Sequence, residues 1–141
     1  MKEKRIFFIS GHRDITYREY TTLYLPKIIE CIDKYDAYFI MGDYEGVDIM
    51  AQNTLMGVLE YPTDKVTVYH MSDKPRNAHP LIKNFIGGFK TDEERDYAMS
   101  SESHEDIAFV RCGRFDSGTA QNIIRRYAFF SNSKETKKYL K

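Results

Sequence analysis

Four short apolar segments recur along this chain, and segments with helical periodicity or loop composition separate them. The apolar segments are 5–10, 37–41, 65–71 and 106–111. Each is continuous and short, which is typical of a strand buried on both faces of a sheet. Strands that alternate with helices predict a parallel sheet with right-handed crossovers. We therefore predict an α/β fold, a single Rossmann-like doubly wound domain with a mainly parallel sheet of about four to five strands and helices on both faces.

The predicted helices begin at recognisable caps. Residues 16–19 and 91–94 have the spacing of a capping box, and Ser117 is the expected cap of the last helix. Pro26 interrupts the first helix, so we expect a kink or a break there. The expected inward faces are Tyr20, Leu23, Ile28, Cys31, Ile32 and Tyr35 in the first helix, Val47, Met50, Ala51, Leu55 and Val58 in the second, and Ala120, Ile123, Ile124 and Tyr127 in the last.

Residues 72–90 form an unusually long connection, with two prolines and a Gly87-Gly88 pair. Connections of this length in compact domains are often functional or mobile. The apolar side chains within it predict that it packs on the rest of the domain. We expect the domain to span residues 1–130, followed by a polar tail or short helix at 131–141.

Composition limits the possible functions. The chain has 141 residues, enough to build one core without a metal or disulfides. Its 21 Lys and Arg balance 21 Asp and Glu, so the net charge argues against a dedicated duplex-binding protein, and nucleic acid is not an expected partner. Cys31 and Cys112 lack metal spacing, and no metal or required cofactor is expected. With no signal peptide or spanning segment in the sequence, we expect a cytoplasmic protein without membrane contact.

Similar polar turns follow three of the predicted strands, at residues 10–13, 42–48 and 113–119. In such sheets, ligands bind outside the carboxyl ends of the strands. Glycine and hydroxyl residues at the start of a helix leave backbone N–H groups free to hold an anion. Each turn is also explained as a strand-to-helix connection with a capped helix. Together the three predict a nucleotide or sugar-phosphate site, although neither a GxGxxG fingerprint nor a Walker loop is present.

Individual side chains in these turns have alternative roles. Arg13 is suited to a charge-assisted contact with an anion. Asp48 either stabilises a helix dipole or accepts hydrogen bonds from ribose hydroxyls, and Glu45 lies at a loop tip. Arg95 and Asp96 are either a surface pair or part of a helix that leans over the site.

Four segments resemble the SLOG superfamily, the Rossmann-like group that includes the LOG phosphoribohydrolases and the DprA/Smf DNA-processing proteins. They are FISGHRDIT, MGDYEGVDIMAQ, RDYAM and DIAFVRCGRFDSGTAQNI, which lie in the family's order between about residues 5 and 126. Within the superfamily, the chain is most similar to small bacterial and phage proteins of the YspA/YpsA-like kind. The resemblance implies a pocket for a nucleotide, nucleotide sugar or NAD/ADP-ribose-like ligand, and an oligomer such as a homodimer. It places Gly42 and Asp48 on the floor, Ser117–Thr119 at the phosphate, and Arg95 reaching in from the third helix.

The expected ligand-binding residues are Ser10, Gly11, His12, Arg13, Gly42, Asp43, Glu45, Gly46, Asp48, Arg95, Met99, Ser117, Gly118 and Thr119. The chain departs from the LOG loop PGGxGTxxE, because Asn122 stands at the position of its catalytic glutamate. An amide cannot act as general base or nucleophile. We therefore expect ligand binding, as in a sensor, and no catalytic residue is identified. The carboxylates that could substitute are Asp116, Asp48, Glu45 and Asp96.

Two alternative functions stay open. One is an N-glycosidic hydrolase, phosphoribohydrolase or deoxyribosyltransferase-like, since glycosyl chemistry requires well-placed carboxylates. The other is single-stranded DNA binding or processing, as in the DprA group. A basic patch for that role would comprise Lys83, Lys90, Arg111, Arg114, Arg125 and Arg126.

Overall fold

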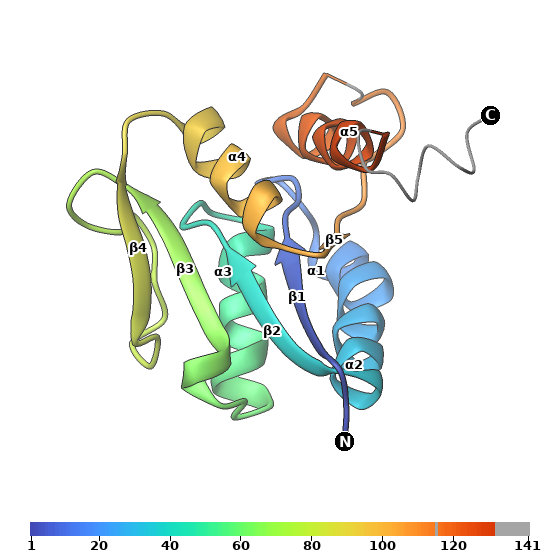
Figure 1. Ribbon diagram of the computed structural model, residues 1–141, viewed down its shortest axis with the longest axis vertical. Coiled ribbons are helices and arrows are strands. Elements are labelled where there is room, and N and C mark those ends of the chain that lie inside the picture. The colour runs from blue at the N-terminus through green and yellow to red at the C-terminus, as the bar shows by residue number, and fades with distance from the viewer. Residues whose placement is uncertain (115, 132–141) are drawn as a thin grey trace.

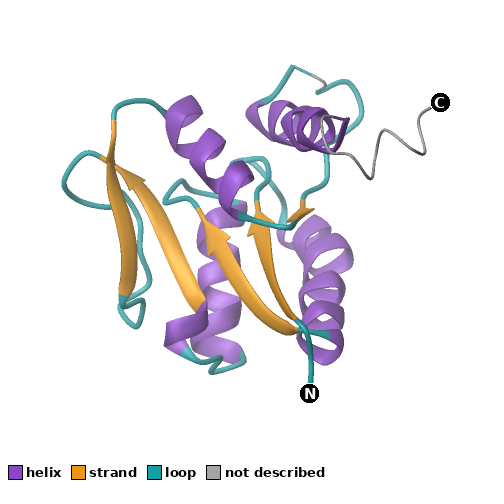
Figure 2. Ribbon diagram, in the orientation of Figure 1, coloured by secondary structure: helices purple, strands orange, loops and turns teal. Residues whose placement is uncertain are grey.

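The computed structural model describes residues 1–114 and 116–131 (Figure 1). Its elements are β1 (Lys4–Ile9), α1 (Tyr17–Glu19), the π-helical segment η1 (Tyr20–Tyr24), α2 (Leu25–Lys34), β2 (Asp36–Met41), α3 (Val47–Gln52), a second π-helical segment η2 (Asn53–Val58), the 3₁₀ turn η3 (Thr63–Lys65), β3 (Val66–Met71), β4 (Asn84–Phe89), α4 (Asp92–Glu102), β5 (Glu105–Ile107) and α5 (Gly118–Ser131). Figure 2 shows strands and helices as separate layers.

All five strands are parallel, in the order β4-β3-β2-β1-β5. The first four strands are laid down in sequence from β1 outward. After β4 the chain returns through α4 to the opposite edge, where β5 pairs with β1. Strand order therefore reverses between β1 and β5. In doubly wound sheets the carboxyl ends at such a reversal form a crevice.

Helices cover both faces of the sheet, as the sequence predicted. Phe7, Phe39 and Val66 are partners across the register and point to the face that α2 and α3 cover. Their neighbours along the strands, Phe8 and Ile40, point to the other face, where Met99 of α4 packs on them. Figure 1 shows α4 on the opposite side of the sheet from α2 and α3. Burial on both faces explains why the strands are continuously apolar.

The first helix begins at the expected capping box and contains a π-helical turn. Thr16 Oγ1 accepts the Glu19 N–H at 3.1 Å, and Glu19 Oε1 accepts the Thr16 N–H at 3.0 Å. The interruption expected at Pro26 takes the form of η1, which ends just before it. Pro26 then lies in the first turn of α2, where its missing N–H is not needed. Within η1, the buried Tyr24 hydroxyl donates to Ser10 O at 2.8 Å and so supports the loop after β1.

The π-helical segments explain why two predicted core positions were wrong. Leu23 and Val58 were expected to face inward, but both are exposed, Val58 by 75%. A π turn contains one residue more than an α turn, and this shifts the helical phase of the residues that follow. In α5 the predicted inward face is only partly correct. Ala120 is buried, but Ile124 and Tyr127 are more than 60% exposed, because α5 packs on α4 and β5 along part of its surface.

Two strand predictions were also wrong. The long connection 72–90 ends in an edge strand, β4, which the Gly87-Gly88 pair concealed because glycine is unfavourable in strand interiors. The last strand, expected at 106–111, is limited to the three residues of β5, and the chain then leaves the sheet. The tail expected at 131–141 lies outside the described residues, apart from Ser131 at the end of α5.

Candidate functional site

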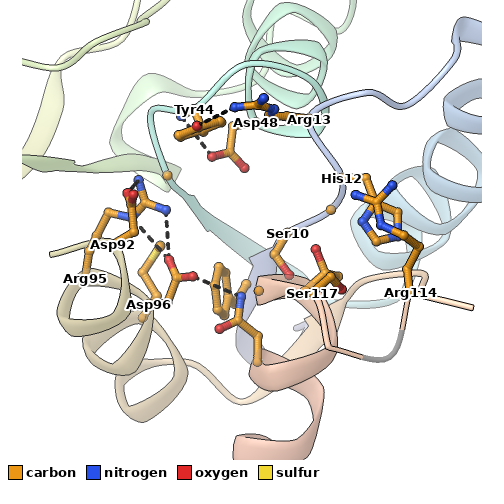
Figure 3. A pocket seen from close by; sticks show the side chains of 17 residues that line it. Ser10, His12, Arg13, Tyr44, Asp48, Asp92, Arg95, Asp96, Arg114 and Ser117 are labelled. Atoms are coloured by element: carbon orange, nitrogen blue, oxygen red, sulfur yellow. Dashed lines mark hydrogen bonds and ion pairs between the residues drawn. The ribbon is translucent and has the colours of Figure 1, made fainter. Parts of the chain in front are cut away.

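A pocket of about 330 Å³ opens at the carboxyl edge of the sheet, where strand order reverses (Figure 3). Its walls come from the ends of β1 and β2, from α4, and from the start of α5. The lining residues are Phe8, Ser10, Gly11, His12, Arg13, Gly42, Tyr44, Asp48, Asp92, Arg95, Asp96, Met99, Arg114, Ser117, Gly118, Thr119 and Asn122. The three polar turns that the sequence singled out therefore meet around one cavity.

Most of the expected ligand-binding residues line this pocket. Those that do are Ser10, Gly11, His12, Arg13, Gly42, Asp48, Arg95, Met99, Ser117, Gly118 and Thr119. Asp43, Glu45 and Gly46 do not. Asp43 is fully buried beneath the pocket, and Glu45 lies at the loop tip, with its Oε1 3.9 Å from Arg13 Nε. Gly46 has φ +83° and packs on the backbone of the β1 loop, where a Cβ would lie 2.4 Å from Arg13 Cα.

One wall of the pocket offers hydrogen-bond donors. Gly118 begins the fourteen-residue helix α5, and Ser117 Oγ caps it by accepting the Ala120 N–H at 3.2 Å. Ser10, which is 6% exposed, has an Oγ with no hydrogen-bond partner among the described residues. Arg114 adds a positive charge beside this wall and pairs with Asp14, its Nη1 lying 3.4 Å from Asp14 Oδ2. The positive end of the helix dipole and these groups favour an anion.

A second wall of the pocket carries carboxylates, and the guanidinium of Arg95 lies among them. Arg95 is 5% exposed, and its Nη2 lies 2.9 Å from Asp96 Oδ1. Its Nη1 lies 2.8 Å from Asp43 Oδ1 and 3.2 Å from Asp92 Oδ1. The resemblance had suggested that Arg95 reaches the ligand. Arg95 lines the pocket, and its guanidinium is also engaged with three carboxylates, so it holds this acidic wall together.

Asp48 lies on the same wall, and its carboxylate is almost completely enclosed. Asp48 Oδ2 accepts the Tyr44 N–H at 3.1 Å. Burial raises the pKa of Asp48 to about 7, although the charge of Arg95 acts in the opposite direction. Gly42 makes this arrangement possible, because a Cβ there would lie 2.7 Å from Asp48 Oδ2 and 2.8 Å from Arg95 Cζ.

Asp96 has a different environment from Asp48. Burial raises the pKa of Asp96, and hydrogen bonds to Arg95 and Asn122 oppose the shift. Asn122 Nδ2 donates to Asp96 Oδ2 at 3.3 Å, and Asn122 Oδ1 accepts from Arg125 Nη1 at 2.8 Å. Asn122 therefore orients a carboxylate that α4 supplies. Of the four candidate carboxylates, Asp48 and Asp96 line the pocket; Glu45 and Asp116 are exposed outside it.

His12 lines the pocket and connects it to the loop after β5. Its Nε2 accepts the Arg111 N–H at 2.9 Å. Burial lowers the pKa of His12, and the charges of Arg114 and Arg111 lower it further, so the ring is neutral and keeps this acceptor at neutral pH. Arg111 Nη2 in turn donates to Glu19 Oε1 at 2.9 Å, and this contact lowers the pKa of Glu19 to about 2. The loop after β5 is thereby fixed to the first helix.

Six lining residues are absent from the expected ligand-binding set, namely Phe8, Tyr44, Asp92, Arg114, Asn122 and Asp96, the last of which was expected only as a candidate carboxylate. Some signals were present. Asp92 lies three residues before Arg95 on a predicted helix, where i and i+3 share a face. Tyr44 lies inside the polar turn 42–48. The position of Arg114 depends on a loop whose path the sequence does not specify.

The six basic residues considered for a nucleic-acid surface do not form one patch. Lys83 and Lys90 flank β4, at one edge of the sheet. The four arginines lie beyond β5, at the other edge. Several of these are neutralised: Arg126 Nη2 is 3.2 Å from Asp106 Oδ1, and Arg111 pairs with Glu19.

Comparison with protein-family models, with curated proteins and with solved structures gives no match. Within residues 1–114 and 116–131, no helix has the length and apolar character needed to cross a bilayer. Across the same residues, His, Cys, Asp and Glu form no group of three or more that could hold a metal ion.

Proposed function

We propose that this chain binds a phosphate-bearing, nucleotide-type ligand in the pocket at the carboxyl edge of the sheet. The observation that carries the proposal is the division of the pocket into two unlike walls. The start of α5, with Ser10 and Arg114 beside it, presents donors and positive charge. Asp48 and Asp96 present acceptors on the acidic wall, which meets the α5 wall where Asn122 donates to Asp96. A ligand that fits both walls carries an anion at one end and hydroxyl groups at the other.

The chemistry of a ribose phosphate matches this division. Free N–H groups at a helix N-terminus hold phosphate oxygens. Carboxylates accept hydrogen bonds from ribose hydroxyls, as acidic residues do in dinucleotide sites. The unpartnered Ser10 Oγ supports a ligand group at the donor wall, because buried polar atoms normally have a partner. A volume of about 330 Å³ suits one small ligand. The resemblance to the SLOG superfamily agrees with the same class of ligand.

Two serines provide a matched test. Ser10 and Ser100 both have buried Oγ atoms without a partner among the described residues, but Ser10 lines the pocket and Ser100 does not. Removing either hydroxyl breaks no hydrogen bond that the structure shows. We expect Ser10→Ala to weaken the binding of AMP or ribose 5-phosphate by about tenfold or more in calorimetric titration, since a hydrogen bond to a charged group contributes roughly 1.5–3 kcal/mol. Ser100→Ala should bind as the wild type does. Equal affinities for all three proteins would contradict the site assignment.

A second candidate function is hydrolysis of an N-glycosidic bond, and the pair Asp48 and Asp96 favours it. Two carboxyl groups at one cavity are the usual equipment of glycoside hydrolysis, and burial raises the pKa of both Asp48 and Asp96. Protonated Asp48 would donate its proton to the departing base nitrogen as the C1′–N bond breaks. Asp96 would accept a proton from the water whose oxygen bonds to C1′. Solvent exchange would then restore both carboxyl groups.

Separation of the products after incubation with a panel of nucleotides, NAD and ADP-ribose tests this reaction. Release of free base that Asp48→Asn and Asp96→Asn both abolish would support hydrolysis. Binding without release would leave the protein as a sensor. Base release that survives both substitutions would contradict the assignment of these two carboxylates.

A further inference from the structure

Tyr44 separates the main pocket from a second, smaller hollow. This second hollow has a volume of about 220 Å³ and is lined by Tyr44, Glu45, Arg76 and Asn77. Tyr44 lines both cavities, whereas Arg76 lines only the smaller of these two. Arg76 therefore lies on the side of the Tyr44 ring that faces away from the main pocket.

Arg76 covers this outer side of the ring and is itself firmly held. Its Cζ lies 4.7 Å from the centre of the Tyr44 ring, within the range of a cation–π contact. The Arg76 backbone N–H donates to Asp43 Oδ2 at 2.7 Å, and its Nη2 donates to Asp43 Oδ1 at 2.9 Å. Asp43 is fully buried, so it anchors the guanidinium to the interior. The connection 72–83 thus contributes to the site indirectly, because its Arg76 packs on the ring of Tyr44.

The hydroxyl end of Tyr44 is held as well. Arg13 Nη1 donates to Tyr44 Oη at 2.9 Å, which joins the β1 loop to the β2 loop across the rim of the pocket. Arg13 Cζ is 5.8 Å from the ring centre, because the contact is made at the hydroxyl. Figure 3 shows the ring nearly edge-on above Asp48, and Tyr44 is one of the residues that line the main pocket. An aromatic ring is therefore held in place at the lining of a pocket that also contains Arg13, Asp48 and Arg95.

We infer that Tyr44 is the stacking platform for the base of a nucleotide, so that the ligand is a nucleotide and not a sugar phosphate alone. The inference rests on the proposed function, in which the phosphate lies at α5 and the ribose at the carboxylates. An aromatic ring at the lining offers a surface on which a planar group of the ligand can stack. A ring already fixed by Arg76 and Arg13 loses little freedom when a base stacks on it. Stacking of this kind accepts any base, because every base has a π-face.

Two substitutions at one position test the platform. Tyr44→Leu removes the ring and keeps an apolar side chain, whereas Tyr44→Phe keeps the ring and removes the hydroxyl. We expect Tyr44→Leu to weaken AMP binding on the order of tenfold, as removal of a stacking aromatic does elsewhere. The same protein should bind ribose 5-phosphate as the wild type does. Tyr44→Phe should retain most of the affinity for AMP, and thermal unfolding should show that both variants are folded.

The outcomes separate this inference from the proposed function. If the wild type binds AMP and ribose 5-phosphate equally well, or if Tyr44→Leu weakens both to the same extent, the stacking platform is wrong while the pocket assignment stands. If the wild type binds neither compound, the proposed function fails and the platform fails with it. A selective loss of AMP binding in Tyr44→Leu establishes both.

Discussion

Replacing Asp48 by Asn should make the protein more stable at neutral and alkaline pH. The reason is the enclosed position of this carboxylate, whose pKa burial raises from 3.8 to about 7. Between these two values the folded protein holds a proton that the unfolded chain releases. Stability therefore falls by about 1.4 kcal/mol for each pH unit in this window, and the penalty is fully present above pH 7. Asparagine has the same shape and no charge, so it avoids this cost.

The magnitude follows from the width of the window. From pH 5 to pH 7 the wild type should lose about 3 kcal/mol relative to Asp48→Asn, and further alkalinity should add little. The amide oxygen can still accept the Tyr44 N–H, so the local hydrogen bond is kept. Urea unfolding of both proteins at pH 5 and pH 8 measures the difference directly. The advantage of Asp48→Asn over the wild type should be about 3 kcal/mol larger at pH 8 than at pH 5.

Asp43→Asn is the matched control, because this neighbouring carboxylate should respond in the opposite direction. Burial would raise the pKa of Asp43, but hydrogen bonds and charge from Arg76 and Arg95 outweigh it and hold the pKa below its usual value. Its stabilising contribution is present above the unfolded pKa. Removing this buried partner should cost about 3 kcal/mol or more at pH 7. If Asp48→Asn were destabilising at pH 8, or if its effect did not change with pH, the account of the acidic wall would be wrong.

Two further predictions concern packing and thiol reactivity. Gly42→Ala should destabilise the fold by about 1–3 kcal/mol in urea, because the new Cβ would crowd Asp48 and Arg95, whereas Gly118→Ala meets nothing within 4 Å and should be close to neutral. Equal stabilities would contradict the close approach at Gly42. In the native protein a thiol reagent should modify the exposed Cys112, while Cys31 stays protected because burial raises its pKa to about 11. Rapid reaction of two thiols without denaturant would contradict the buried position of Cys31.

The sequence predicted the layers of this fold well because its strongest signals are local. Continuous apolar strands and the boxes at 16–19 and 91–94 each specify an element without knowledge of its neighbours. β4 was missed because its stability comes from pairing with β3, which offsets the poor strand propensity of Gly87-Gly88. Leu23 and Val58 were misplaced because π-helical turns break the 3.6-residue period.

For the site, the sequence identified the polar turns but not the partners of their side chains. Parallel strands bring their carboxyl ends to one edge, so Ser10, Gly42 and Ser117 could be expected near one another. The role of Arg95 could not be read in this way. Its ion pair with Asp43 joins residues 52 positions apart, and that contact depends on how α4 crosses the sheet. The contacts of Arg76 could not be predicted for the same reason, since Arg76 lies within a connection of no regular structure.

The buried carboxylates Asp48 and Asp96 of the acidic wall lower the stability of the folded protein and at the same time offer hydrogen-bond acceptors to a ligand. Arg95 is surrounded by Asp43, Asp92 and Asp96, with Asp48 nearby, so negative charge exceeds positive charge at this point. Arg76 adds a second positive charge, from the side away from the pocket. Four carboxylates share these two arginines, and burial raises the pKa of Asp48, which lines the pocket, so its charged form carries a cost in the folded protein. A ligand hydroxyl that donates to Asp48 would relieve the cost by supplying the hydrogen bonds that burial removed. Ligand binding should therefore stabilise the wild type more than it stabilises Asp48→Asn, in which there is no such charge to relieve.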